Sequence, residues 1–205
     1  MKRIVVLISG NGSNLQALID QQQRGGGSWA ICRVISNRQK AFGLTRAGQA
    51  GIPTSTLSLA AFKREHRGGG GGEEGRAHFD RELARIIVKE EPQLVVCAGW
   101  MHILSAAFLD ALAGIRIINL HPALPGQFNG AGAIRWAYDA WQRGECQQTG
   151  VMVHDVIALV DMGAPVLVRP VPFHPGDTLD QLEERIHLAE HAALVEAVEQ
   201  IVHTL

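Results

Sequence analysis

Residues 4–14 read IVVLISGNGSN, an apolar run followed at once by small polar residues. Residues 4–8 are all branched and apolar, which is typical of a strand buried on both faces of a sheet. The run is too short for the hydrophobic region of a signal peptide, and the glycines that follow interrupt it. We therefore predict that the chain begins with a buried strand, a glycine-rich turn and a helix.

Short β-branched runs continue to alternate with longer helical patterns after this start. The predicted strands cover residues 4–8, 31–35, 54–57, 94–98 and 116–119, and the predicted helices cover residues 15–23, 42–50, 77–91, 106–112 and 131–142. This alternation indicates parallel βαβ units. The predicted fold is α/β, a doubly wound and mostly parallel sheet with a Rossmann-like N-terminal half, and such sheets bind ligands at the carboxyl ends of their strands.

The last third of the chain follows a different pattern. Residues 150–156 and 165–171 alternate like strands with no long helix between them, which predicts an antiparallel or mixed edge. Residues 179–202 predict a long amphipathic helix. Nothing resembling a linker divides the chain, so we expect a single domain over residues 1–205. The five consecutive glycines at 68–72 are expected to form a surface insertion.

The composition excludes several classes of protein. With 46% hydrophobic residues and a formal net charge of −1, the chain can bury a core and offers no broad basic face for nucleic acid. It has no apolar run long enough for a membrane span. Cys32, Cys97 and Cys146 form no CxxC pair, so we expect reduced thiols in a cytoplasmic protein rather than disulfides or a thiolate metal site.

The first candidate site is the loop SGNGSN at residues 9–14. Small residues between a strand and a helix let backbone N–H groups approach an anion such as a phosphate. The loop is not the dinucleotide fingerprint, because Leu15 replaces the third glycine, and it lacks the Gly-Lys ending of a P-loop. The alternative is an ordinary turn in which Ser13 or Asn14 caps the helix.

Polar residues also stand at two later points in the chain. Asn119 and His121 alternate with Leu120 just past a predicted strand, so their side chains can share one side. A histidine can act as a general acid or a charged stabiliser, and an asparagine amide can donate to an oxyanion. Asp161 lies between apolar residues and a turn. The alternatives are a structural histidine and an aspartate that serves only the turn.

The segment HLAEH at 187–191 matches the H-x-x-E-H pattern of one group of zinc peptidases. Its two histidines could share a metal on one helical face. No third ligand is evident, and the same helix is rich in glutamate, so polar histidines need no special cause there. We expect no metal site.

Eight segments carry a resemblance that runs in order along nearly the whole chain: VVLISGNGSNLQALID (5–20), ISN (35–37), AHFDREL (77–83), VVCAGWMHILS (95–105), RIINLHPALPG (116–126), VMVHDV (151–156), LVDMGAPV (159–166) and GDTLDQLEERIHLAEH (176–191). They resemble the glycinamide ribonucleotide formyltransferase family. The segment HPALPGQFNG at 121–130 is more similar to the fungal branch of this family than to its bacterial branch.

This resemblance implies an enzyme that moves the formyl group of 10-formyltetrahydrofolate to the amine of N1-(5-phospho-D-ribosyl)glycinamide in purine (IMP) biosynthesis. It implies small-molecule substrates, no metal, no nucleic acid and no membrane, in a monomer or homodimer. Residues 1–115 would form the phosphate- and ribonucleotide-binding half, and residues 116–205 the catalytic and folate-binding half.

The resemblance also assigns individual residues. The implied catalytic residues are Asn119, His121 and Asp161; the implied ribonucleotide-binding residues are Gly12, Ser13, Asn14 and Glu190; the implied folate-binding residues are Arg76, Met101, His102, Ile103, Leu104, Ile157 and Asp161. His102 stands where bacterial members often carry arginine. The glycines just before Arg76 make its alignment the least secure of these.

In the implied reaction the amine attacks the formyl carbon, and Asn119 with a protonated His121 stabilises the resulting oxyanion. Asp161 would favour the charged imidazole and accept the proton of the amine through water. Two alternatives stay open: formyltetrahydrofolate hydrolase, in which water replaces the amine, and a nucleotide-binding module without catalysis. A tRNA formyltransferase fits less well, because no further domain or basic surface is evident.

Overall fold

The computed structural model describes residues 1–25, 28–60, 62 and 73–205. The glycine run at 68–72, which was expected to form a surface insertion, lies outside the described residues. Within the described residues, the strands are β1 (Lys2–Ile8), β2 (Trp29–Ser36), β3 (Thr54–Thr56), β4 (Leu94–Cys97), β5 (Arg116–His121), β6 (Gln148–Asp155) and β7 (Pro165–Pro172). The helices are α1 (Ser13–Gln23), α2 (Phe42–Gln49), α4 (Glu73–Val88), α5 (Ala106–Ala111), α6 (Ala133–Gln142) and α7 (Leu179–Thr204).

The strands of the described residues follow the order β3-β2-β1-β4-β5-β6-β7. The pairs β3-β2, β2-β1 and β1-β4 are parallel, whereas β5-β6 and β6-β7 are antiparallel. This confirms the predicted α/β fold with its mostly parallel sheet and antiparallel edge. The chain divides into two compact units, one of residues 1–117 with Leu205 and one of residues 118–204.

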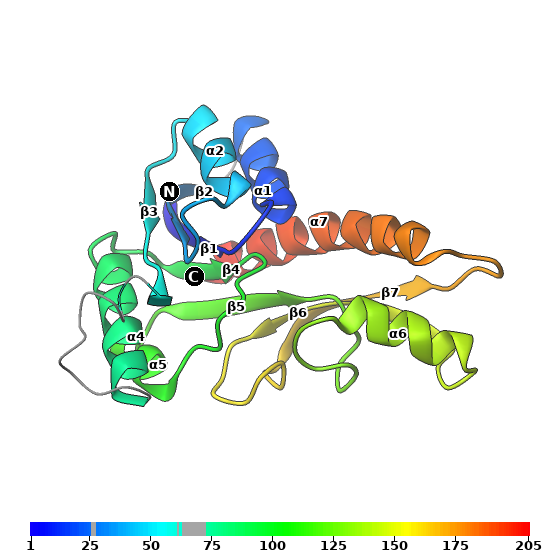
Figure 1. The fold of residues 1–205 in the computed structure, drawn as a ribbon. Coiled ribbons are helices and arrows are strands. Elements are labelled where there is room, and N and C mark those ends of the chain that lie inside the picture. Colours follow the sequence, from blue (N-terminus) through cyan, green and yellow to red (C-terminus); the bar gives the residue numbers. More distant parts are fainter. Residues whose placement is uncertain (26–27, 61, 63–72) are drawn as a thin grey trace. The chain divides into compact units, whose positions relative to one another are not determined.

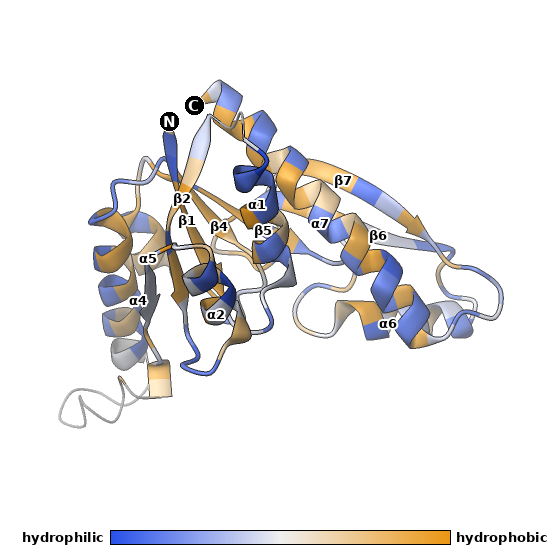
Figure 2. Ribbon diagram, turned by 90° about the horizontal axis from the view of Figure 1, so that it is seen from above, coloured by the Kyte–Doolittle hydropathy of each residue, from blue (hydrophilic) through white to orange (hydrophobic). Residues whose placement is uncertain are grey.

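The first unit is doubly wound around β1. Helices α1 and α2 cover one face of its parallel strands, and α4 and α5 cover the other (Figure 1). Ile4 to Ile8 are fully buried, which explains why this strand tolerates only apolar side chains. Figure 2 shows β1 and β4 as hydrophobic strands between these helices.

The second unit is built on the antiparallel strands. Helix α7 packs along β6 and β7 and also contacts α6. Its buried side follows the predicted amphipathic spacing, with Leu182, Ile186, Leu194 and Ile201 inside. None of the helices in the described ranges is long and apolar enough to cross a membrane.

Two boundaries differ from the prediction in ways that matter for the site. Strand β5 was predicted to end at 119 but continues to His121, because His121 still pairs with Met152 of β6. Pro122, which has no N–H to donate to the sheet, follows directly. Helix α4 begins at Glu73, earlier than the predicted residue 77, since the glycine-rich sequence before it gave no signal for a helix start.

The turn between β7 and α7 is held by an ion pair. The Arg185 guanidinium donates to both carboxylate oxygens of Asp177, at 2.9 and 2.7 Å. The same carboxylate accepts the N–H of His174 at 2.7 Å, and the Tyr138 hydroxyl donates to the Asp177 carbonyl at 3.0 Å. The Arg185 hydrogen bond, helped by the His174 N–H, lowers the pKa of Asp177 to about 2.

We predict that Asp177→Asn lowers the melting temperature at pH 7 by about 2–4 °C. A carboxylate with a lowered pKa stabilises the folded state above its unfolded pKa of about 3.9, and that contribution is lost as the pH falls toward 2. The gap between wild type and variant in urea unfolding should therefore shrink between pH 4 and pH 2. Glu145→Gln breaks an exposed ion pair with Arg143 and is the matched control, with no resolvable change expected.

Candidate active site

Strands β5 and β6 bring three polar side chains of the second unit together. Asn119 and His121 are two residues apart on β5, so they project to the same face. The antiparallel register places His154 of β6 directly opposite Asn119. The Asn119 amide nitrogen Nδ2 lies 3.2 Å from His154 Nε2.

Asp161 completes this group from the loop between β6 and β7. Its backbone has φ +55°, in the left-handed region that aspartate tolerates in turns, and Met162 N donates to Leu159 O across it at 3.3 Å. Asp161 therefore does form a turn, as expected for an aspartate that serves only the turn, but its side chain also joins the polar cluster. It is only 9% exposed.

Each carboxylate oxygen of Asp161 has two neighbours in the cluster. Oδ2 accepts the Gly130 N–H at 2.8 Å and lies 3.4 Å from His121 Nδ1. Oδ1 accepts from Asn119 Nδ2 at 3.3 Å and lies 3.5 Å from His154 Nε2. A buried carboxylate is stable only when it is satisfied in this way.

The environment shifts the pKa of both ionisable partners. Burial alone would raise the pKa of Asp161, but its hydrogen-bonded surroundings, the Gly130 N–H and the His121 imidazole among them, outweigh burial and lower it below 3.8. Burial lowers the pKa of His121 below 6.5, and the opposing charge of Asp161 does not cancel this effect. At neutral pH the unliganded site therefore holds an ionised Asp161 beside a largely neutral His121.

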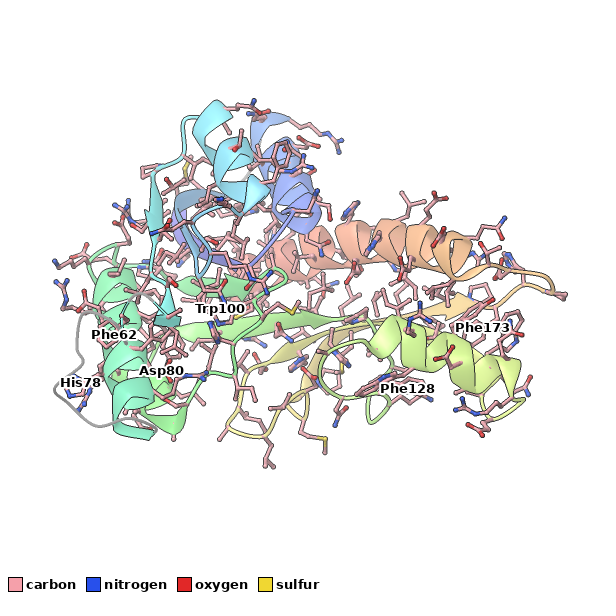
Figure 3. All side chains as sticks on the ribbon, viewed as in Figure 1. Phe62, His78, Asp80, Trp100, Phe128 and Phe173 are labelled. Carbon is pink, nitrogen blue, oxygen red and sulfur yellow. The ribbon has the colours of Figure 1, made fainter. Side chains whose placement is uncertain are left out.

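The second ring nitrogen of His121 is the open position of the cluster. Nε2 is buried, yet no hydrogen-bond partner for it exists among the described residues. Buried polar atoms are normally paired, and an exception calls for a ligand or a water. The loop from β5 to α6, which contains Phe128 (Figure 3), has positive φ at Phe128 and at Gly130. The Gly130 N–H donates to Asp161.

The glycine loop of the first unit has the form expected for an anion site. Gly12 is the N-cap of α1, with φ +76°, and no side chain caps the helix, so the capping alternative for Ser13 and Asn14 is wrong. An added Cβ on Gly12 would lie 2.6 Å from Gly43 Cα, which explains why a glycine is needed. The Arg46 guanidinium stabilises the loop by donating to the backbone and side-chain oxygens of Asn11, both at 3.0 Å.

Five of the residues predicted at the folate lie in the first unit. Arg76 of α4 contacts Asp80 at 3.4 Å and donates to the Ile103 carbonyl, so it does meet the 101–104 segment. The first and third side chains of that segment, Met101 and Ile103, are each 62% exposed.

The other two residues of the 101–104 segment face inward. Leu104 is buried, and His102 packs against Phe79 and Trp100, the latter labelled in Figure 3. Burial and the charge of Arg76 lower the pKa of His102. The remaining two predicted folate residues, Ile157 and Asp161, lie in the second unit, in the loop after β6, where Ile157 is exposed.

Glu190 lies on the buried side of α7. Its Oε2 is 2.8 Å from His187 Nδ1, and this hydrogen bond raises the pKa of His187. The H-x-x-E-H spacing thus gives an ion pair between its first and fourth residues. Within the described part of the chain, no group of three or more His, Cys, Asp or Glu side chains is arranged to hold a metal ion.

His154 is the site residue that the sequence interpretation missed. It is buried and contacts both Asn119 and Asp161. The only signal was a histidine and an aspartate directly after the apolar run Val151–Val153. Nothing in the sequence alone gives the register that places His154 opposite Asn119.

Known proteins resemble this chain over its whole length. The family model described as formyl transferase matches residues 2–198. The phosphoribosylglycinamide formyltransferase of Schizosaccharomyces pombe is 54% identical over 203 residues, which cover 97% of this chain and 96% of that protein. The enzyme of the same name from Saccharomyces cerevisiae is 45% identical over 212 residues, covering 100% of this chain and 99% of its own.

A solved structure agrees with these sequence matches. Glycinamide ribonucleotide transformylase 1 from Symbiobacterium toebii superposes with a TM-score of 0.86 at 35% identity, covering 100% of this chain and 89% of the other. Fold, sequence and the expected fungal similarity therefore agree. The chain belongs to the formyl transferase family.

Proposed function

We propose that this chain transfers the formyl group of 10-formyltetrahydrofolate to the primary amine of N1-(5-phospho-D-ribosyl)glycinamide, a step of purine (IMP) biosynthesis. The observation that carries the proposal is the cluster of Asn119, His121 and Asp161, in which the buried His121 Nε2 has no hydrogen-bond partner among the described residues. Family membership and the names of the relatives support the same reaction.

In this proposal the amine nitrogen attacks the formyl carbon, and the carbonyl oxygen takes up the negative charge. Asn119 donates an N–H to that oxygen, and His121 donates from Nε2 once it is protonated. Because a developing anion favours the charged imidazole, His121 takes up a proton from water as the intermediate forms and returns it when the intermediate collapses, although burial keeps it largely neutral beforehand. Asp161 stabilises this imidazolium through the contact with Nδ1.

The intermediate then collapses. The amine has lost a proton, which Asp161 receives through water, and the bond from the formyl carbon to N10 of the folate breaks as N10 gains a proton. The products are the formylated ribonucleotide and tetrahydrofolate. Each proton released by the amine is matched by the one that N10 takes up, so the chemistry requires no metal or redox partner.

The substrates follow from the two units. We propose that Gly12, Ser13 and Asn14 bind the phosphate of the ribonucleotide, since the uncapped start of α1 presents backbone N–H groups. Glu190 would contact the same substrate. For the folate we propose, in the first unit, Arg76, a cation suited to a carboxylate, and residues 101–104, and in the second unit Ile157. Asp161 would lie beside the pterin.

The decisive experiment follows folate absorbance after mixing the protein with 10-formyltetrahydrofolate, with and without the ribonucleotide. We expect deformylation only when the ribonucleotide is present, with one formylated product per folate consumed. Equal deformylation in its absence would replace the proposal with a hydrolase. Absence of turnover in both mixtures would leave a binding module.

His121→Ala should keep the fold and lower kcat by about 10²–10³-fold, the cost of removing one oxyanion donor. Steady-state kinetics measure the loss, and circular dichroism checks the fold. His203→Ala, which removes an exposed histidine in the last turn of α7, is the control and should be unchanged. Activity near wild type in His121→Ala would contradict the assigned mechanism.

Ser13→Asp should weaken ribonucleotide binding by about tenfold or more, since about 1.4 kcal/mol of repulsion between the carboxylate and the phosphate has that effect. Calorimetric titration with the ribonucleotide gives the Kd. The same change at Ser28, an exposed residue just before β2, carries the same charge away from the loop and should leave Kd unaltered. Equal affinities for wild type and Ser13→Asp would exclude the loop as the phosphate site.

A further inference from the structure

His154 is fully enclosed in the catalytic cluster, and the reaction above does not use it. Its side chain is only 3% exposed, and it comes from the strand that pairs with β5. Each of its two ring nitrogens has a polar neighbour: Nδ1 lies 2.9 Å from the Asp155 carbonyl oxygen, and Nε2 lies 3.2 Å from Asn119 Nδ2.

The partner of Nδ1 assigns the protonation of the ring. A carbonyl oxygen can only accept, so Nδ1 carries the hydrogen. Gly163 keeps that oxygen accessible, because an added Cβ there would lie 1.6 Å from Asp155 O and 3.2 Å from His154 Nδ1. The Asp155 N–H also donates to Ala164 O at 3.0 Å, which fixes the carbonyl in place.

The Asn119 amide nitrogen can only donate, so Nε2 is the acceptor of that pair. If it were protonated, it would donate to Asp161 Oδ1, and charge-assisted hydrogen bonds of this kind are typically about 2.7–2.9 Å long. The observed separation is 3.5 Å. Asn119 Nδ2 lies nearer to both atoms, 3.2 Å from Nε2 and 3.3 Å from Oδ1, as expected when the amide is the donor to both.

The three distances fix the angle between the two acceptors of the Asn119 amide. Seen from Nδ2, the acceptors Nε2 and Oδ1 are only about 65° apart, whereas the two hydrogens of an amide NH₂ are roughly 120° apart. A single hydrogen that points between the two acceptors can therefore serve both. In that arrangement the second hydrogen of Nδ2 points away from both and is available to another acceptor.

We propose that His154 is a positioning residue which, together with Asp161, holds one hydrogen of the Asn119 amide so that the other faces the formyl oxygen. The inference rests on the proposed function only in naming the oxyanion as the group that this second hydrogen meets. Without the imidazole acceptor only Asp161 Oδ1 holds the amide, so the NH₂ group can turn toward that oxygen and carry its second hydrogen away from the oxyanion. His154 thus sets, together with Asp161, the direction of the second amide hydrogen.

The kinetic test compares His154→Phe, which keeps the ring but has no acceptor, with His154→Gln, which supplies an acceptor oxygen. We expect His154→Phe to lower kcat by about 10²-fold with both KM values changed by less than about twofold, and His154→Gln to recover about tenfold of that loss. In the background of Asn119→Ala, His154→Phe should cause almost no further loss, since its effect passes through the amide. An equal loss in both backgrounds would overturn the proposal.

The second measurement needs neither turnover nor a variant. A long-range ¹H–¹⁵N spectrum of the wild-type protein at neutral pH should show His154 protonated at Nδ1 and unprotonated at Nε2. A proton on Nε2 would overturn the proposal even in a fully active enzyme, and it decides the matter if the Phe variant does not fold. If the wild type transfers no formyl group, the proposed function fails, while this spectrum still accepts or rejects the role of His154.

Discussion

The site depends on one buried carboxylate. Asp161 receives the Gly130 N–H on one oxygen and the Asn119 amide on the other, and each oxygen also has a histidine beside it. A charge removed from water is stable only with such a full set of partners, so the loop conformations around it are constrained. Positive φ at Asp161 and at Gly130 brings the carboxylate and its backbone donor together.

The same carboxylate sets the balance of charge at His121. Burial favours the neutral imidazole and lowers its pKa, while Asp161 acts in the opposite direction. A histidine that is neutral before reaction, but has a carboxylate 3.4 Å from Nδ1, can take up a proton when negative charge develops near Nε2. The stabilising charge therefore appears mainly when the transition state needs it, which is the differential binding that accelerates a reaction.

Most of the fold could be predicted from local pattern, because each parallel strand is a short run such as Ile4–Ile8 that must be entirely apolar. The predicted trio also follows from chemistry at strand ends. His154 could not be found in this way, since its role depends on the antiparallel register that sets it opposite Asn119. The role of Gly163 could not be predicted for a related reason, because its close approach to the Asp155 carbonyl is a tertiary contact without a local sequence signal.

An asparagine at position 119 suits a site that must anchor a donor and also present one. Its NH₂ group has two hydrogens in fixed directions, so holding one between His154 and Asp161 determines where the other points. A hydroxyl group at this position would have a single hydrogen. That hydrogen could bind His154 and Asp161, or it could be donated to the oxyanion, but it could not do both. A lysine ammonium has hydrogens to spare, yet its charge would form an ion pair with Asp161 and compete with His121 for the carboxylate. The amide provides a neutral, directed donor and leaves the charge on the imidazole.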